Sequence, residues 1–151
     1  MPLLKTFSKG GVHPPENKLS ASKPIQYLAV PKTVVIPVSQ HIGAPATVIV
    51  QKNEMVKTGQ IIARSSGFVS ANIHSSVTGK VSKIESFMDS TGYARQSVII
   101  ETEGDEWLEN INTSNEIIRD FDFTPEEIIQ KVGEAGIVGL GGATFPSQVK
   151  L

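Results

Sequence analysis

VIVQKNEMVKTGQIIARSSGFVSANIHSSVTGKV, residues 48–81, is the part of this sequence that most clearly indicates a fold. Two turn signals lie inside it, at Val56–Gln60 and at Val77–Val81. β-branched residues flank both turns, and the same pattern continues to about Glu101. Short apolar runs between glycine-bearing turns are typical of short strands, so we expect a compact domain that is mainly β.

Composition limits the classes of function that this chain can have. Its 151 residues carry a formal net charge of −1, which gives no general attraction to nucleic acid, and we expect no nucleic-acid partner. There is no cysteine, so the chain itself can form no disulfide, ligate no iron–sulfur cluster and use no thiol nucleophile. No apolar run has the length of a membrane span, and the first residues lack the apolar core of a secretory signal. We expect a soluble chain with no direct membrane span.

Changes in composition divide the chain into four parts. Residues 1–26 are rich in turn formers and predict an extended segment. Residues 27–104 are the predicted β domain. Residues 105–123 are acidic and predict a linker that partly wraps this domain, with Trp107 and Leu108 as anchors.

Residues 124–151 predict the beginning of a second domain, and they open with the signals of a helix. Thr124 can cap the helix, Pro125 suits its first position, and Glu127 stands where a capping box needs it. Gly133 or Gly136 would end the helix.

The glycine-rich segment that follows is the clearest candidate for a binding site. Gly136, Gly139, Gly141 and Gly142 fall within seven residues, and glycines allow the backbone to approach a ligand closely. A phosphate or dinucleotide loop is one interpretation, although the spacing is not that of the common dinucleotide fingerprint. A flexible linker is the alternative. His13, His41 and His74 lack the spacing of metal ligands, and no metal site is expected.

The spacing V-K-x-G-Q-x-I at Val56–Ile62, with G-K-V at Gly79–Val81, resembles the biotinyl and lipoyl carrier domains. Those domains are barrel-sandwich hybrids that hold a modified lysine in the hairpin midway between the two motifs. Here the midway residues are Gly67–Ser70, and no lysine lies between Lys57 and Lys80. The resemblance therefore implies the scaffold without the swinging arm.

A second resemblance covers nearly the whole chain. The motifs FSKGGVHPPENK (7–18), QHIGAP (40–45) and GFVSA (67–71) resemble those of the C subunit of the Rnf electron transport complex. The family begins with a barrel-sandwich hybrid domain and continues into a domain similar to the 51-kDa flavin- and NADH-binding subunit of respiratory complex I. It ends with two [4Fe–4S] clusters. The resemblance implies FMN and NADH as ligands of the full-length chain and other subunits of the complex as partners. It also implies a peripheral place on the cytoplasmic face of the cytoplasmic membrane, in a complex that couples electron transfer to ion transport.

The flavin loop of the complex I subunit is approximately G-x-x-G-R-G-G-A-G-F-P-x-G-x-K. This chain departs from that pattern at Leu140, Thr144 and Gln148, and the loss of the arginine leaves the role of that side chain unfilled. The resemblance implies that the cofactor-binding residues are those that match the pattern: Gly136, Gly139, Gly141, Gly142, Ala143, Phe145 and Lys150.

The resemblance implies an N-terminal piece of a longer subunit, which we expect to bind no cofactor and to have no catalytic residue of its own. Its β domain would then serve structure or docking. We also expect Gly133–Leu151 to be mobile, because glycines cost backbone entropy to order and the rest of their domain is absent. The alternative is a free-standing carrier-like or adaptor β domain, with the glycine-rich segment as a linker.

The missing carrier lysine gives a first test. Phe68 and Val69 stand where the modified lysine would be, so co-expression with a biotin or lipoate ligase should leave the intact mass unchanged. Intact mass spectrometry measures this directly. A mass gain equal to either group on any lysine would contradict the expectation.

Overall fold

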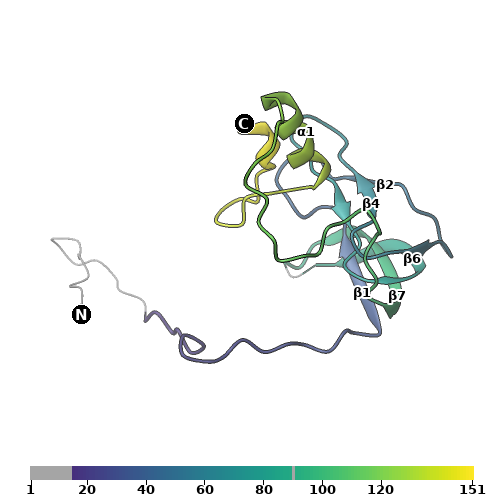
Figure 1. Ribbon diagram of the computed structural model, residues 1–151. Helices are drawn as coiled ribbons and strands as arrows, with labels where there is room; N and C mark the ends of the chain where they lie inside the picture. Colours follow the sequence, from purple (N-terminus) through teal and green to yellow (C-terminus); the bar gives the residue numbers. More distant parts are fainter. Residues whose placement is uncertain (1–14, 90) are drawn as a thin grey trace, which may run out of the picture.

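The computed structural model describes residues 15–89 and 91–151 (Figure 1). The expected extended segment at the N-terminus therefore lies outside the described residues as far as Pro14. The described chain is mainly β, as expected, with one α-helix and one short 3-10 helix. The elements in chain order are β1 (Thr33–Pro37), β2 (Thr47–Val48), β3 (Met55–Val56), β4 (Ile61–Arg64), β5 (Ile73–His74), β6 (Thr78–Met88), β7 (Ala94–Gly104), α1 (Pro125–Glu134) and η1 (Ser147–Val149).

The strands form two antiparallel sheets. One has the order β1-β7-β6-β3 and the other the order β2-β4-β5. The long hairpin of β6 and β7 is the centre of the larger sheet, with Val81 opposite Ile100. Strand β1 lies along the other side of β7, with Ile36 opposite Val98. The two long strands are interior to the larger sheet. In both sheets the strands at the edges are shorter than the longest interior strand.

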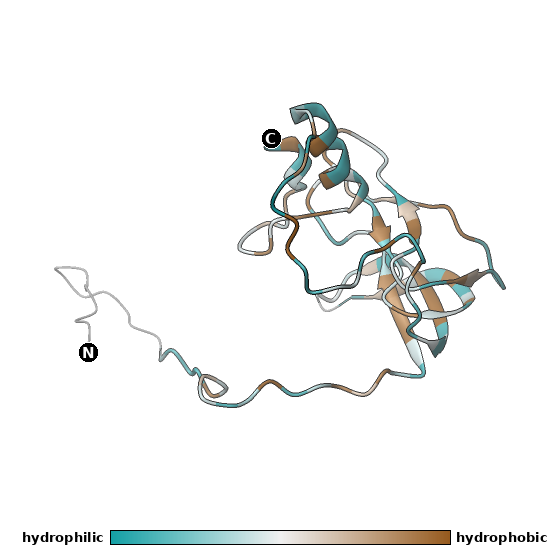
Figure 2. Ribbon diagram, in the orientation of Figure 1, coloured by the Kyte–Doolittle hydropathy of each residue, from teal (hydrophilic) through white to brown (hydrophobic). Residues whose placement is uncertain are grey.

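One apolar core joins the two sheets. Side chains from both sheets and their connecting loops gather in it, and brown apolar segments mark the strands that supply many of them (Figure 2). The alternation of buried and exposed residues at the start of β6 shows the period of two that a sheet with one buried face requires. The core residues are Ile36, Val38, Ala46, Val50, Val56, Ile62, Ala63, Ile73, Val77, Val81, Val98 and Ile100.

The first predicted turn is present and anchors the start of the linker. Gln60 donates its backbone N–H to the Lys57 carbonyl, which closes the turn. Thr58 pairs with the linker on both sides: its N–H reaches the Glu106 carbonyl, and its carbonyl accepts from Leu108. A side chain at Gly59 (φ +84°) would overlap Ile111. The linker is thus held here largely by its backbone.

The second predicted turn, Val77–Val81, is wrong. Thr78–Val81 forms the beginning of β6, with an irregularity in the pairing with β7 between Thr78 and Gly79. A Cβ on Gly79 would overlap the Glu101 carbonyl, so glycine is needed here for a close approach of two strands.

The chain from Pro15 to Lys32 contains no strand and leads away from the sandwich (Figure 1). Strand formation begins at Thr33, after Pro31, a residue that cannot donate to a ladder. Ile25, Tyr27 and Leu28 are more than nine-tenths exposed.

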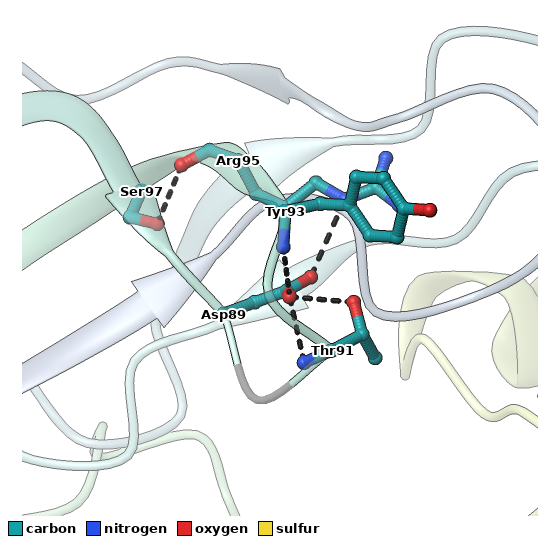
Figure 3. Close-up of polar contacts among 5 residues, drawn as sticks. All are labelled: Asp89, Thr91, Tyr93, Arg95 and Ser97. Carbon is teal, nitrogen blue, oxygen red and sulfur yellow. Dashed lines mark hydrogen bonds and ion pairs between the residues drawn. The ribbon is translucent and has the colours of Figure 1, made fainter.

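Asp89 organises the turn between β6 and β7 (Figure 3). Its Oδ1 accepts from the Thr91 hydroxyl at 2.6 Å, from the Thr91 N–H at 2.8 Å and from the Tyr93 N–H at 3.2 Å. Its Oδ2 accepts from Arg95 Nε at 3.3 Å. Ser97 holds the next part of β7 through a 3.0 Å hydrogen bond to the Arg95 carbonyl. The hydrogen bond from the Thr91 side chain, followed by those from Tyr93, the Thr91 N–H and Arg95, lowers the pKa of Asp89 from 3.8 to about 2.

This lowered pKa predicts an acid-sensitive hairpin. The folded state holds the Asp89 proton more weakly than the unfolded chain, so the stabilising effect is complete above pH 3.8 and is lost as the pH falls to about 2. In Asp89→Asn this part of the acid dependence should disappear. Urea unfolding at several pH values measures it, with Asp105→Asn, an exposed carboxylate, as the control. Equal acid dependence in wild type and Asp89→Asn would contradict the prediction.

Candidate functional site

Helix α1 begins as the sequence predicts. The Thr124 side chain accepts from the Glu127 N–H at 3.3 Å, and Glu127 Oε2 accepts from the Thr124 N–H at 2.8 Å. This is a complete capping box with Pro125 at the first position. The acidic residues of the first turn also interact favourably with the positive end of the helix dipole.

The helix ends through Gly136, one of the two predicted positions. Gly136 donates to the Gly133 carbonyl at 3.0 Å, and Ile137 donates to the Val132 carbonyl at 3.3 Å. Gly136 has φ +64°, so this is the paired arrangement of a left-handed glycine cap. Gly133 lies inside the helix, where a Cβ would overlap the Gln148 side chain.

Backbone hydrogen bonds close the next residues into a loop. Gly139 donates to the Phe145 carbonyl at 3.0 Å, and Ser147 donates to the Ile137 carbonyl at 2.9 Å. Pro146, which is buried, lies opposite Val138 between these two bonds. We call residues 139–145 the glycine loop. Its ends are fixed by this short antiparallel pairing.

The tip of the glycine loop faces solvent. A Cβ on Gly141 or Gly142 would meet nothing within 4 Å. Leu140, which stands where the flavin loop that this segment resembles has arginine, is 89% exposed. Thr144, at a position where that loop has glycine, has φ +51° and donates its hydroxyl to the Ala143 carbonyl. The space a ligand would need is therefore open on this side.

A positive charge lies beside the loop. Lys150 Nζ is 5.4 Å from the centre of the Phe145 ring, a cation–π distance, and about 4.0 Å from where a Cβ on Gly139 would be. Backbone amides of a glycine-rich loop next to an ammonium group form an arrangement that suits an anionic group such as a phosphate.

The structure thus brings together six of the seven predicted site residues: Gly139, Gly141, Gly142, Ala143, Phe145 and Lys150. Gly136 lies apart from them. A Cβ on Gly136 would overlap the Asn72 carbonyl and come within 3.1 Å of His74, so this glycine faces the β domain.

The expectation that Gly133–Leu151 is mobile stays a prediction, and in the structure both parts of this segment that flank the glycine loop are hydrogen-bonded to the β domain. Asn72 donates to the Gly133 and Glu134 carbonyls at 3.4 and 3.2 Å, and Gln148 donates to the Ser70 carbonyl at 3.2 Å. The departure from glycine at Gln148 thus has a structural reason. Sequence reasoning missed Asn72 because nothing local marks a partner so far along the chain.

An open groove of about 1000 Å³ lies where the linker and the end of α1 meet the β2-β4-β5 sheet. Arg64, His74, Trp107 and Glu134 are among its lining residues. Burial lowers the pKa of His74 below 6.5, and a hydrogen bond with the Glu134 backbone offsets part of this effect. His74 therefore favours its neutral form in the folded state.

His41 has a packing role. Its Nε2 accepts from the Ala71 N–H at 3.1 Å, and its Nδ1 lies 3.1 Å from the Ile42 carbonyl, which assigns the proton to Nδ1. Within residues 15–89 and 91–151, no three His, Cys, Asp or Glu side chains are grouped as metal ligands would be. The part of the chain that the structure describes also has no helix with the length and apolar character of a membrane span.

Comparison with known proteins agrees with this architecture. Residues 5–105 match the family described as the RnfC barrel sandwich hybrid domain, and the chain belongs to that family. The expected barrel-sandwich fold is thereby confirmed.

Individual relatives extend the likeness through the glycine loop. The C subunit of a proton-translocating ferredoxin:NAD(+) oxidoreductase complex from Clostridium ljungdahlii is 48% identical over 99% of this chain and 32% of its own length. The C subunit of a Na(+)-translocating ferredoxin:NAD(+) oxidoreductase complex from Acetobacterium woodii is 44% identical over 95% of this chain and 32% of its own length. The C subunit of an ion-translocating oxidoreductase complex from Rhodobacter capsulatus is 39% identical over 98% of this chain and 29% of its own length. The chain thus spans about a third of the length of these relatives.

The different surroundings of Gly136 and Gly141 give a matched pair of substitutions. Gly136→Ala forces a side chain into a left-handed conformation, which costs about 1–2 kcal/mol, and into the Asn72 carbonyl as well. Gly141→Ala meets open space. In Gly136→Ala, the protection free energy of the Ile137 and Gly139 amides should fall by at least this amount. In Gly141→Ala it should be unchanged. Equal protection in the two variants would show that Gly136 does not face the β domain.

Proposed function

We propose that this chain is the N-terminal part of the C subunit of an ion-translocating ferredoxin:NAD oxidoreductase complex. The observation that carries the proposal is the alignment of such subunits with 95–99% of the chain, through both the β domain and the glycine loop. The full-length subunit would pass electrons between NADH and ferredoxin as part of an assembly that moves ions. It would be a peripheral subunit on the cytoplasmic face of the cytoplasmic membrane.

The β domain would have a structural or docking role in that assembly. Its hairpin tip carries Phe68 where a carrier domain has its lysine, so no covalent arm is expected there. The partners of the domain would be other subunits of the complex. The [4Fe–4S] clusters would be held outside these 151 residues, since this chain supplies no cysteine.

The glycine loop would form one side of the FMN and NADH site. The residues present fit a nucleotide: Gly141 and Gly142 leave space, the loop carries backbone N–H groups, and Lys150 supplies a charge that suits a phosphate. FMN, when bound, supplies the exchange between hydride transfer and single-electron transfer. The task of this chain's residues is to bind and orient the nucleotide. Gly139 and Phe145 hold the ends of the loop, and Ala143 continues its small-residue surface.

Substitution in the loop of the full-length subunit tests this role. Gly142→Val, and equally Gly141→Val, should abolish FMN binding because the new side chain occupies the ligand's space, whereas Lys150→Ala should weaken binding less. Leu140→Val is the matched control, since it replaces an exposed side chain of the same loop and puts no side chain in place of a glycine. FMN released from the purified subunit gives the flavin content, and calorimetry gives the affinity.

The variants have an interpretable outcome because the fold tolerates a side chain at Gly142. Undiminished FMN and NADH binding in Gly142→Val would show that the site lies elsewhere. The 151-residue chain alone should show no measurable FMN or NADH binding, because one loop offers few contacts in return for ordering a ligand. Tight FMN binding by this chain alone would overturn that expectation.

A further inference from the structure

The hairpin tip of the β domain, residues 65–72, is held by several hydrogen bonds at the place where a carrier domain has its lysine hairpin. Ser70 is fully buried, and its hydroxyl donates to the Ala44 carbonyl at 2.9 Å and accepts from the Ser66 N–H at 3.1 Å. The Ser66 hydroxyl donates to the Pro45 carbonyl at 2.6 Å. The His41 ring accepts from the Ala71 N–H at 3.1 Å. The tip is thus tied to the loop before β2 at several points.

Asn72 uses both ends of its carboxamide. Its Oδ1 accepts from the Ser65 N–H at 3.0 Å, which holds the side chain within the hairpin. Its Nδ2 donates to the carbonyls of Gly133 and Glu134, in the last turn of α1. Carbonyls in the last turn of a helix lack the usual helical donor, and Asn72 supplies one from another part of the fold, beside the Gly136 N–H that also reaches the Gly133 carbonyl. The residue is only 9% exposed in this arrangement.

Two further contacts converge on the same tip. Gly136 approaches the Asn72 carbonyl so closely that no side chain fits between them. Gln148, in η1, donates to the Ser70 carbonyl at 3.2 Å and packs on Gly133. Gly136 precedes the glycine loop and Gln148 follows it. The tip therefore contacts the chain on both sides of the loop.

We propose that the hairpin tip holds the glycine loop in its position, with Asn72 and Gln148 as the positioning residues. Ile137 pairs with Ser147 next to these contacts and closes the loop. Contacts that fix the two ends of the loop therefore fix the direction in which the loop faces. The consequence that the tip orients a flavin and NADH site rests on the proposed function. The contact itself does not.

Amide exchange of the 151-residue chain tests the contact without any nucleotide. Gln148→Ala removes one donor outside the sandwich, and exchange at Gly139 and Ser147 should become about fivefold to tenfold faster, as loss of one hydrogen bond implies. Exchange in β6 and β7 should stay unchanged. Gln130→Ala is the matched control, since Gln130 bonds Glu134 within the helix at 2.8 Å and has no contact of this kind with the tip.

Asn72→Asp is the second variant. It keeps the acceptor for the Ser65 N–H but cannot donate to α1, and it places a negative charge at the negative end of the helix. The same local loss of protection is expected, with a larger effect than in Gln148→Ala. Unchanged exchange at Gly139 and Ser147 in both variants would overturn the proposal, as would an equal loss in Gln130→Ala. Because no flavin or NADH is used, this result stands even if the loop proves to bind neither.

Discussion

Val81, Val98 and Ile100 of the larger sheet share one core with Ile62 and Ala63 of the smaller sheet, and each of the five is 0% exposed. Complete burial of a valine or isoleucine side chain contributes about 1.5–3 kcal/mol, so this layer outweighs any single polar contact in the chain. Its effect reaches beyond the core. The hairpin tip is positioned by β4 and β5, which lead into and out of it and contribute Ile62, Ala63 and Ile73 to this core. The end of α1 and the glycine loop depend in turn on that tip.

Signals that act over a few residues were predicted correctly from the sequence. The capping box at Thr124 and the turn at Lys57–Gln60 are both present, because each depends on residues within one turn of the chain. Val77–Val81 resembles the first turn in sequence, but its glycine is required for a different reason. Gly79 is required by the Glu101 carbonyl of a neighbouring strand, and no local pattern reports such a neighbour.

The candidate site shows the same division. Glycine spacing indicated a loop, and the loop exists, but Gly136 cannot be told from Gly141 by spacing although the two have different surroundings. Two contacts hold the ends of the loop in place. Asn72 and Gly133 are separated by 61 positions in the sequence, and Ser70 and Gln148 by 78 positions. Polar side chains of this kind have many possible partners in a sequence, and only the packed fold selects one.

The order of the strands has a consequence for how the domain meets other chains. Both eleven-residue strands are interior, whereas β2, β3 and β5 have two residues each and β1 ends at Pro37. Exposed long edges invite intermolecular strand addition, and short or proline-terminated edges resist it. In the described chain, the sandwich therefore offers little template for amyloid-like growth. Edges of this kind need no covering chain to keep the strands of a second copy from adding to them.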